Sequence, residues 1–132
     1  MERIEWDTLW IGLADLVSQR SVDPKLKVGC AIVSSDNTRV LAIGYNGDHK
    51  GGPNERESMI SGSSGFIHAE INALIKCDFA TIGEKKIYLT HSPCKMCAKA
   101  IINAGIKEVI YKNIYDQSSI DFIKNFVNIR KI

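Results

Sequence analysis

The spacing of apolar and polar residues divides this chain into predicted helices and strands. Residues 4–19 predict an amphipathic helix, because apolar side chains recur there at helical intervals. Its apolar positions include Ile4, Leu9, Ala14, Leu16 and Val17. Two short apolar runs follow, at 28–33 and 40–45, and a polar turn at 34–37 separates them. This arrangement is typical of two buried strands joined as a β-hairpin.

Beyond residue 65, helical and strand patterns alternate. Helices are predicted at 68–77, 93–104 and 118–124, and strands at 86–90, 107–111 and 126–129. Strands connected through helices favour an α/β fold, with a central mixed sheet of about five strands flanked by helices. One long loop, 46–65, is rich in glycine, serine and charge. Loops of this length in compact domains are frequently functional.

The composition is typical of a globular protein, and its charge favours a small-molecule ligand over a nucleic acid. The chain has 132 residues, of which 45% are apolar and 24% charged, so we expect one domain spanning residues 1–132. Its formal net charge of +2 is too small for the strongly basic surface typical of proteins that bind duplex nucleic acid. We therefore expect no nucleic-acid partner, whereas a small anionic substrate remains compatible.

The cysteine content and the N-terminal residues indicate the cellular compartment in which we expect the protein. Four cysteines in this chain do not make a disulfide framework, so we expect a reducing, cytoplasmic environment. The N-terminal segment has acidic side chains where a signal peptide has basic and apolar ones. No apolar stretch approaches the length of a membrane span, so we expect no membrane association.

Two short motifs supply candidate metal ligands. A His-Ala-Glu triplet begins at His68, and a Pro-Cys-x-x-Cys segment supplies Cys94 and Cys97. One imidazole and two thiolates make a three-ligand zinc set with an open fourth position, as in catalytic zinc sites. Glu70 is then the candidate proton carrier beside that position. An H-x-E triplet followed by P-C-x-x-C is typical of zinc deaminases that act on nucleobases, so we expect one catalytic Zn²⁺ per chain.

The spacing within the second motif predicts a helix start. Proline is tolerated at an early helical position, so we expect Pro93 to open the helix. Cys94 and Cys97 are three residues apart and therefore share a helix face, and the positive end of the helix dipole favours their thiolate forms. If the helix that begins near His68 points to the same spot, zinc lies between two helix starts.

A C-x-x-C pair also has other uses. It can form a redox dithiol or half of a structural zinc site. No second C-x-x-C is present to complete four thiolates, and a redox dithiol would need neither His68 nor Glu70. The remaining cysteines, Cys30 and Cys77, are expected to be small core residues.

Several longer stretches resemble a known family. They are 21–33 (SVDPKLKVGCAIV), 44–47 (GYNG), 65–74 (GFIHAEINAL), 90–111 (THSPCKMCAKAIINAGIKEVIY) and Tyr115-Asp116. In these stretches the chain resembles the cytidine deaminase superfamily, and most closely the deoxycytidylate (dCMP) deaminases. GYNG favours the dCMP branch, as does Ser92 where the tRNA deaminase branches have a glutamate. The resemblance implies the three-layer α/β/α cytidine deaminase-like fold.

The resemblance implies hydrolysis of dCMP to dUMP and ammonia, which supplies dUMP for thymidylate synthesis. Glu70 then moves a proton from the attacking water to N3 of the cytosine ring and later to the leaving amine. Backbone groups near Ala69 and Ser92 are expected to hold the base edge. Asn46 is expected to hydrogen-bond the deoxyribose or the phosphate, and Tyr115 to stack on the base.

The resemblance also implies regulation and assembly. Many dCMP deaminases are activated by dCTP and inhibited by dTTP, through a site matched here by Gly44, Asn46 and Gly47. The family looks hexameric, so we expect a homo-oligomer. Some members hold a second, structural zinc in the loop after GYNG, but this loop has His49 and no cysteine, so we predict none. Basic candidates for phosphate binding are Arg20, Lys25 and Lys27.

Two alternatives stay open. One is another deaminase of the same superfamily, acting on free cytidine, a tRNA adenosine or a related base, since pocket shape decides such choices. The other is a non-enzymatic zinc module that uses this domain for binding or assembly. A Glu70→Gln change separates enzyme from module, because an enzyme would lose turnover while it keeps its zinc.

Overall fold

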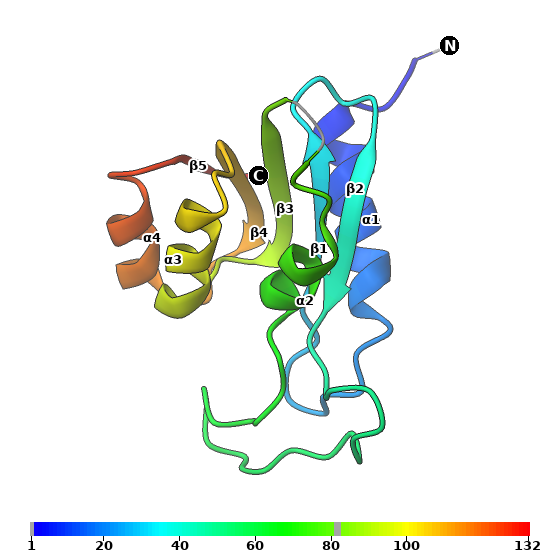
Figure 1. The fold of residues 1–132 in the computed structure, drawn as a ribbon, viewed down its shortest axis with the longest axis vertical. Coiled ribbons are helices and arrows are strands. Elements are labelled where there is room, and N and C mark those ends of the chain that lie inside the picture. Colours follow the sequence, from blue (N-terminus) through cyan, green and yellow to red (C-terminus); the bar gives the residue numbers. More distant parts are fainter. Residues whose placement is uncertain (1, 81–82) are drawn as a thin grey trace.

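A five-stranded mixed sheet forms the middle layer of the protein, with helices against both faces (Figure 1). The computed structural model describes residues 2–80 and 83–132. In chain order the elements are α1 (Trp6–Ser18), β1 (Gly29–Ser34), β2 (Val40–Tyr45), α2 (Ala69–Lys76), β3 (Lys85–His91), α3 (Lys95–Asn103), β4 (Glu108–Asn113), α4 (Gln117–Ile123) and β5 (Asn128–Lys131). The predicted three-layer α/β/α architecture is confirmed. Within the described ranges, no helix has both the length and the apolar character needed to span a membrane.

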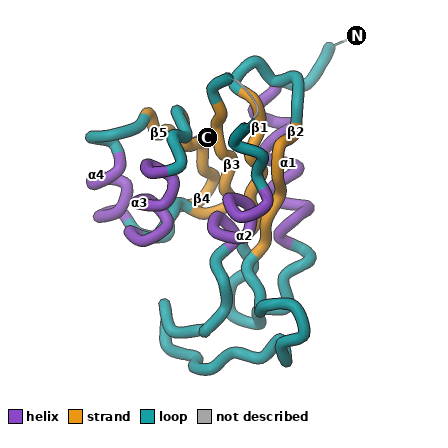
Figure 2. The backbone as a smooth tube through the Cα atoms, in the orientation of Figure 1, coloured by secondary structure: helices purple, strands orange, loops and turns teal. Residues whose placement is uncertain are grey.

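The sheet has the strand order β2-β1-β3-β4-β5 (Figure 2). β1 pairs antiparallel with both β2 and β3, and its pairing with β2 is the predicted hairpin. β3, β4 and β5 run parallel, because α3 and α4 return the chain to the starting end of the sheet before each new strand. The predicted last edge strand is confirmed, although it lies slightly beyond 126–129.

The two faces of the sheet are covered unequally. α1 lies on one face, where Trp10 packs with Val33, Tyr88 and Ile110. The other three helices lie on the opposite face, over a larger apolar cluster to which β1, β3 and β4 all contribute. Buried members of that larger cluster include Ile32, Leu89, Ala98, Ile101, Val109 and Ile123. The helix starts that carry the predicted metal ligands belong to this second face.

The buried face of α1 differs in part from its apolar positions in the sequence. Ala14 and Val17 are buried, whereas Leu9 and Leu16 are exposed, Leu16 by 72%. Trp10 completes the buried face. Positions 10, 14 and 17 follow the helical repeat and therefore share one side, while position 16 lies away from it.

Gly44 in β2 lets helix α2 approach the sheet closely. A Cβ atom at this position would lie 2.3 Å from Ala69 O and 2.7 Å from Ala73 N. Close-packed interiors do not tolerate such overlaps, so this separation of β2 and α2 requires glycine. The contact also bears on the site, because α2 begins directly after His68.

We expect Gly44→Ala to destabilise the fold by about 1–3 kcal/mol, because the new methyl group must displace the first turns of α2. Gly47→Ala is the matched control, since the nearest atom to a Cβ there is a Tyr45 ring carbon at 3.9 Å. Urea unfolding followed by circular dichroism measures both. Equal stability of the two variants would show that the packing of α2 does not depend on Gly44.

Candidate active site

The three predicted metal ligands converge. His68 Nδ1 lies 3.2 Å from Cys97 Sγ and 3.5 Å from Cys94 Sγ, and all three donor atoms lie within 4.8 Å of one another. A tetrahedral zinc ion with ordinary Zn–N and Zn–S bonds places such atoms about 3.6–3.8 Å apart. The donor set therefore fits zinc after small shifts of the side chains.

The helix ends explain this convergence. His68 is the N-cap of α2, Cys94 is the N-cap of α3, and Cys97 is the third residue of α3. Side chains at the N-cap and the third helical position both turn toward the helix start, as in a capping box. Pro93 lies before the N-cap, so the prediction that it opens the helix is wrong. Cys94 takes the N-cap with an extended backbone, and helical dihedrals begin only at Lys95.

Glu70 is buried at the start of α2, beside these ligands. The residue is 4% exposed, and burial raises the pKa of its carboxyl group to about 7. A hydrogen bond from the Cys97 thiol and the charge of His68 act against burial and lower the pKa of this carboxyl group. A carboxyl group with a pKa near neutrality can both accept and release a proton at physiological pH. Glu70 thus has the properties expected of a proton carrier.

The two site thiols differ in proton affinity. The pKa of Cys94 falls to about 4, chiefly through its hydrogen bond with Cys97. The same hydrogen bond, together with burial, raises the pKa of the Cys97 thiol well above its usual range. The predicted thiolate form is thus favoured at Cys94, whereas the raised pKa of Cys97 disfavours it there. A bound cation would favour the thiolate form of both sulfurs.

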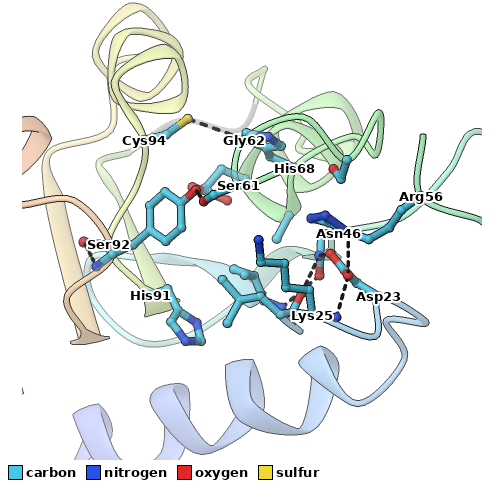
Figure 3. A pocket seen from close by; sticks show the side chains of 16 residues that line it. Asp23, Lys25, Asn46, Arg56, Ser61, Gly62, His68, His91, Ser92 and Cys94 are labelled. Carbon is cyan, nitrogen blue, oxygen red and sulfur yellow. Dashed lines mark hydrogen bonds and ion pairs between the residues drawn. The ribbon is translucent and has the colours of Figure 1, made fainter. Parts of the chain in front are cut away.

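A pocket opens beside these groups (Figure 3). The predicted substrate contacts Asn46, Ala69, Ser92 and Tyr115 all line it, together with His68, Glu70 and Cys94. The glycines of the predicted effector segment lie elsewhere. Gly44 is buried under α2, and Gly47 is buried and exchanges two backbone hydrogen bonds with Ile67.

Ser92 positions one wall of the pocket. Its hydroxyl accepts a hydrogen bond from the backbone N–H of Tyr115 at 2.8 Å, and its own N–H donates to Asn113 O. The Tyr115 hydroxyl in turn lies 3.5 Å from Ser61 Oγ in the long loop. Ser92 thus fixes the backbone of Tyr115 and the end of β4 at this wall of the pocket.

Two further pocket residues were not among the predicted site residues. Asp23 and Arg56 form a buried ion pair, with Arg56 Nε 3.1 Å from Asp23 Oδ1. In the sequence Asp23 lies in the stretch 21–33 that resembles the family, just after a helical pattern, and Arg56 is one charge in a polar loop, so no local signal indicates that they pair. Of the basic phosphate candidates, Lys25 lines the pocket, and its Nζ donates to Met59 O at 2.7 Å.

His91 lines the pocket without joining the metal ligands. Its Nδ1 lies 2.9 Å from Thr90 Oγ1, and the Thr90 hydroxyl also accepts the N–H of Gly29. Burial lowers the pKa of His91, which favours the neutral imidazole. At the end of β3 it therefore serves as an uncharged wall residue.

Comparison with known proteins agrees with this geometry. Residues 4–113 match the family model described as the cytidine and deoxycytidylate deaminase zinc-binding region. ComE operon protein 2 of Bacillus subtilis is 42% identical over 122 residues, which cover 87% of this chain and 63% of that protein. Mouse deoxycytidylate deaminase is 36% identical over 116 residues, covering 82% of this chain and 65% of the mouse protein. The chain thus spans slightly less than two thirds of the length of these relatives.

A solved structure matches the whole chain. It is the dCMP deaminase of cyanophage S-TIM5, in complex with dCMP and dUMP, with a TM-score of 0.84 and 34% sequence identity. The match covers 100% of both chains. Since the family model covers most of the chain and its zinc-binding residues converge, the protein belongs to the cytidine and deoxycytidylate deaminase family.

Proposed function

We propose that this protein is a zinc-dependent deaminase that converts dCMP into dUMP and ammonia. The observation that carries the proposal is the buried Glu70 carboxyl group, with a pKa of about 7, beside three convergent zinc donors. His68, Cys94 and Glu70 line a pocket whose other walls offer polar groups for a sugar and a phosphate. The likeness to a phage dCMP deaminase along the full chain supports dCMP as the substrate.

The geometry of the site suggests a separate role for each residue in this reaction. His68, Cys94 and Cys97 would hold the zinc, which when bound lowers the pKa of a water so that it becomes a nucleophile near neutral pH. Glu70 accepts a proton from the attacking water and delivers it to N3 of the ring as C4 is attacked. It then helps to transfer a proton to the amine, which leaves as ammonia while the C4–N bond breaks.

The pocket also suggests how the nucleotide lies. Figure 3 shows Cys94 at one end and Asp23 and Lys25 at the other. We expect the base at the Cys94 end, with Tyr115 against its face and the carbonyl of Ser92 at its edge. The 5′-phosphate is then expected near Lys25, whose ammonium group can exchange Met59 O for a phosphate oxygen.

Ammonia release from the zinc-loaded protein tests the substrate. We expect turnover of dCMP, with deoxycytidine slower by roughly 10- to 100-fold because it lacks the charged group that Lys25 would bind. CMP and an adenosine in a short tRNA hairpin are measured alongside. Turnover of the hairpin alone would contradict the proposal and place the protein with the RNA-acting deaminases. Lack of turnover with all four substrates would favour the alternative of a non-enzymatic zinc module.

Five further predictions come from the sequence. Activation by dCTP, inhibition by dTTP and a hexameric assembly are implied by the family resemblance. A cytoplasmic location is expected from the cysteine content, and a single domain over residues 1–132 from length and composition. Initial rates with each triphosphate test the regulation, and light scattering tests the assembly. The proposed effector contacts Gly44 and Gly47 are buried backbone positions, so a ligand there would have to bind main-chain groups.

A further inference from the structure

A row of leucines remains uncovered on the outer side of α1. Leu9 and Leu16 are exposed, and Leu13 between them is only partly buried. Their spacing of four and three residues places the three side chains in one row along the helix. In paired helices such a row forms the seam between the two partners. In the part of the chain that the structure describes, α1 packs mainly against β1, β2 and β3, so the row has no helix as its partner.

This row faces the free edge of the sheet at β2. The opposite side of α1 carries Asp7 and Asp15, which pair with Arg130 of β5 and Lys112 of β4. Because β2 lies at the other end of the strand order, the leucines point toward β2. Figure 1 shows α1 next to β2 at this side of the molecule.

Two side chains of β2 extend the apolar surface. Val40 and Ile43 are 46% and 43% exposed and pair with Val33 and Ala31 of β1. Val33 packs with Trp10 beneath α1, so its cross-strand partner and the next but one pair lie on the same face. Contiguous exposed apolar surface marks protein–protein contacts. The α1–β2 patch therefore consists of Leu9, Leu13, Leu16, Val40 and Ile43.

Gly12 lies beside the leucine row, in the middle of α1. A Cβ atom there would meet no other atom within 4 Å, so packing within the described chain does not require glycine. Glycine inside a helix is destabilising relative to alanine, and its usual justification is the close approach of another backbone. A second helix that crosses α1 at Gly12 would supply that approach.

The row is self-complementary. When two copies of α1 run antiparallel about a two-fold axis between positions 12 and 13, Leu9 lies opposite Leu16 of the partner subunit. Gly12 then lies opposite the partner's Leu13, so the largest gap on one helix receives a leucine from the other. An isologous contact requires this kind of pairing, in which one surface fits its own copy.

The charges at the two ends of α1 complete the match. Glu5 precedes the helix and Arg20 follows it, and both are exposed. Within the described ranges neither side chain forms an ion pair. In the antiparallel pair each Glu5 comes near Arg20 of the partner subunit. The same charges also complement the dipole of their own helix, so a test must separate these two roles.

We propose that two copies of this chain associate through the α1–β2 patch, with the α1 helices antiparallel and Gly12 at their crossing. A stable interface buries about 800 Å² on each partner, more than one face of a 13-residue helix provides, so the β2 side chains belong to the contact. The patch lies on the sheet face opposite the metal ligands, and the inference does not depend on the deaminase function. A hexamer, expected from the family resemblance, can contain such a two-fold contact.

Light scattering over a dilution series tests the contact. We expect wild type to contain an even number of chains, and Leu16→Glu to have at most half the wild-type mass, because two charges would be buried at the seam. Leu16 is exposed within one chain, so this variant should fold, as circular dichroism will show. A wild-type mass of one or three chains overturns the proposal, as does an unchanged mass in folded Leu16→Glu.

Gly12→Ala gives opposite expectations for the two explanations of this glycine. At a helix crossing the new methyl group separates the backbones, and the assembly should dissociate at a concentration about tenfold higher or more. In a helix without a partner, alanine meets open space and is the better helix former, so the mass would stay that of wild type. The second result contradicts the crossing at Gly12, and this variant also decides the question if Leu16→Glu does not fold.

Charge reversal tests the antiparallel arrangement. Glu5→Arg and Arg20→Glu each bring like charges together at both ends of the contact and should raise the dissociation concentration by about tenfold. The double variant restores opposite charges between the two copies and has the net charge of wild type, so its assembly should recover. If the charges act only on the dipole of their own helix, the double variant will assemble no better than the single ones, and the antiparallel pairing is overturned.

Discussion

Replacing Glu70 with glutamine is expected to slow deamination by roughly 10²- to 10⁴-fold, the usual contribution of a general acid–base group. Glutamine has nearly the same shape but cannot carry a proton between water, N3 and the leaving amine. Burial raises the pKa of Glu70 to about 7, which suits both halves of this transfer. Ammonia release under saturating dCMP measures the effect, and elemental analysis measures the zinc content of the same sample.

The zinc content gives this prediction its discriminating power. Glu70→Gln should retain one zinc per chain, because the ligands are His68 and the two cysteines. Glu84→Gln, an exposed position after the second helix, is the control and should keep full turnover. Wild-type activity in Glu70→Gln would remove Glu70 from the chemistry, and loss of zinc in it would assign Glu70 to metal binding instead.

Cys97→Ala is expected to lose zinc and, with it, detectable turnover. Cys97 Sγ lies 3.2 Å from His68 Nδ1 and is fully buried, so solvent water cannot easily replace it as a ligand. Changes to groups that merely support a ligand weaken metal binding by about 10- to 100-fold, so removal of a ligand should cost more. Zinc titration against a chromophoric chelator measures the affinity.

The control for this variant is Cys77→Ala. Cys77 is partly buried after α2 and packs against the core at a distance from the metal cluster. It should bind zinc as wild type does, even if it melts at a lower temperature. Stoichiometric, tightly held zinc in Cys97→Ala would mean that the His68–Cys94–Cys97 set is not the zinc site.

Much of this site could be predicted from the sequence, because short motifs mark its residues. Cys94 and Cys97 are placed by their spacing at a helix start, and His68 and Glu70 by theirs at another. The helices and strands were likewise predicted within a few residues, since periodicity in a short window reflects which face is buried. The error at Pro93 arose because proline is also compatible with the position before an N-cap.

The strand order, the covered faces and the pocket wall depended on tertiary structure. Asp23, Asn46 and Arg56 come from three segments, and 23 and 33 residues separate Asp23 from its two partners. In the sequence Gly44 resembles any glycine of a turn or strand, and only the close packing of the α2 backbone shows that glycine is required there. Each of these depends on contacts between segments far apart in sequence, which local propensity does not encode. Burying a charged or polar group is favourable only when folding places a hydrogen-bond or ion-pair partner beside it. The role of such a group therefore cannot be predicted from its local sequence.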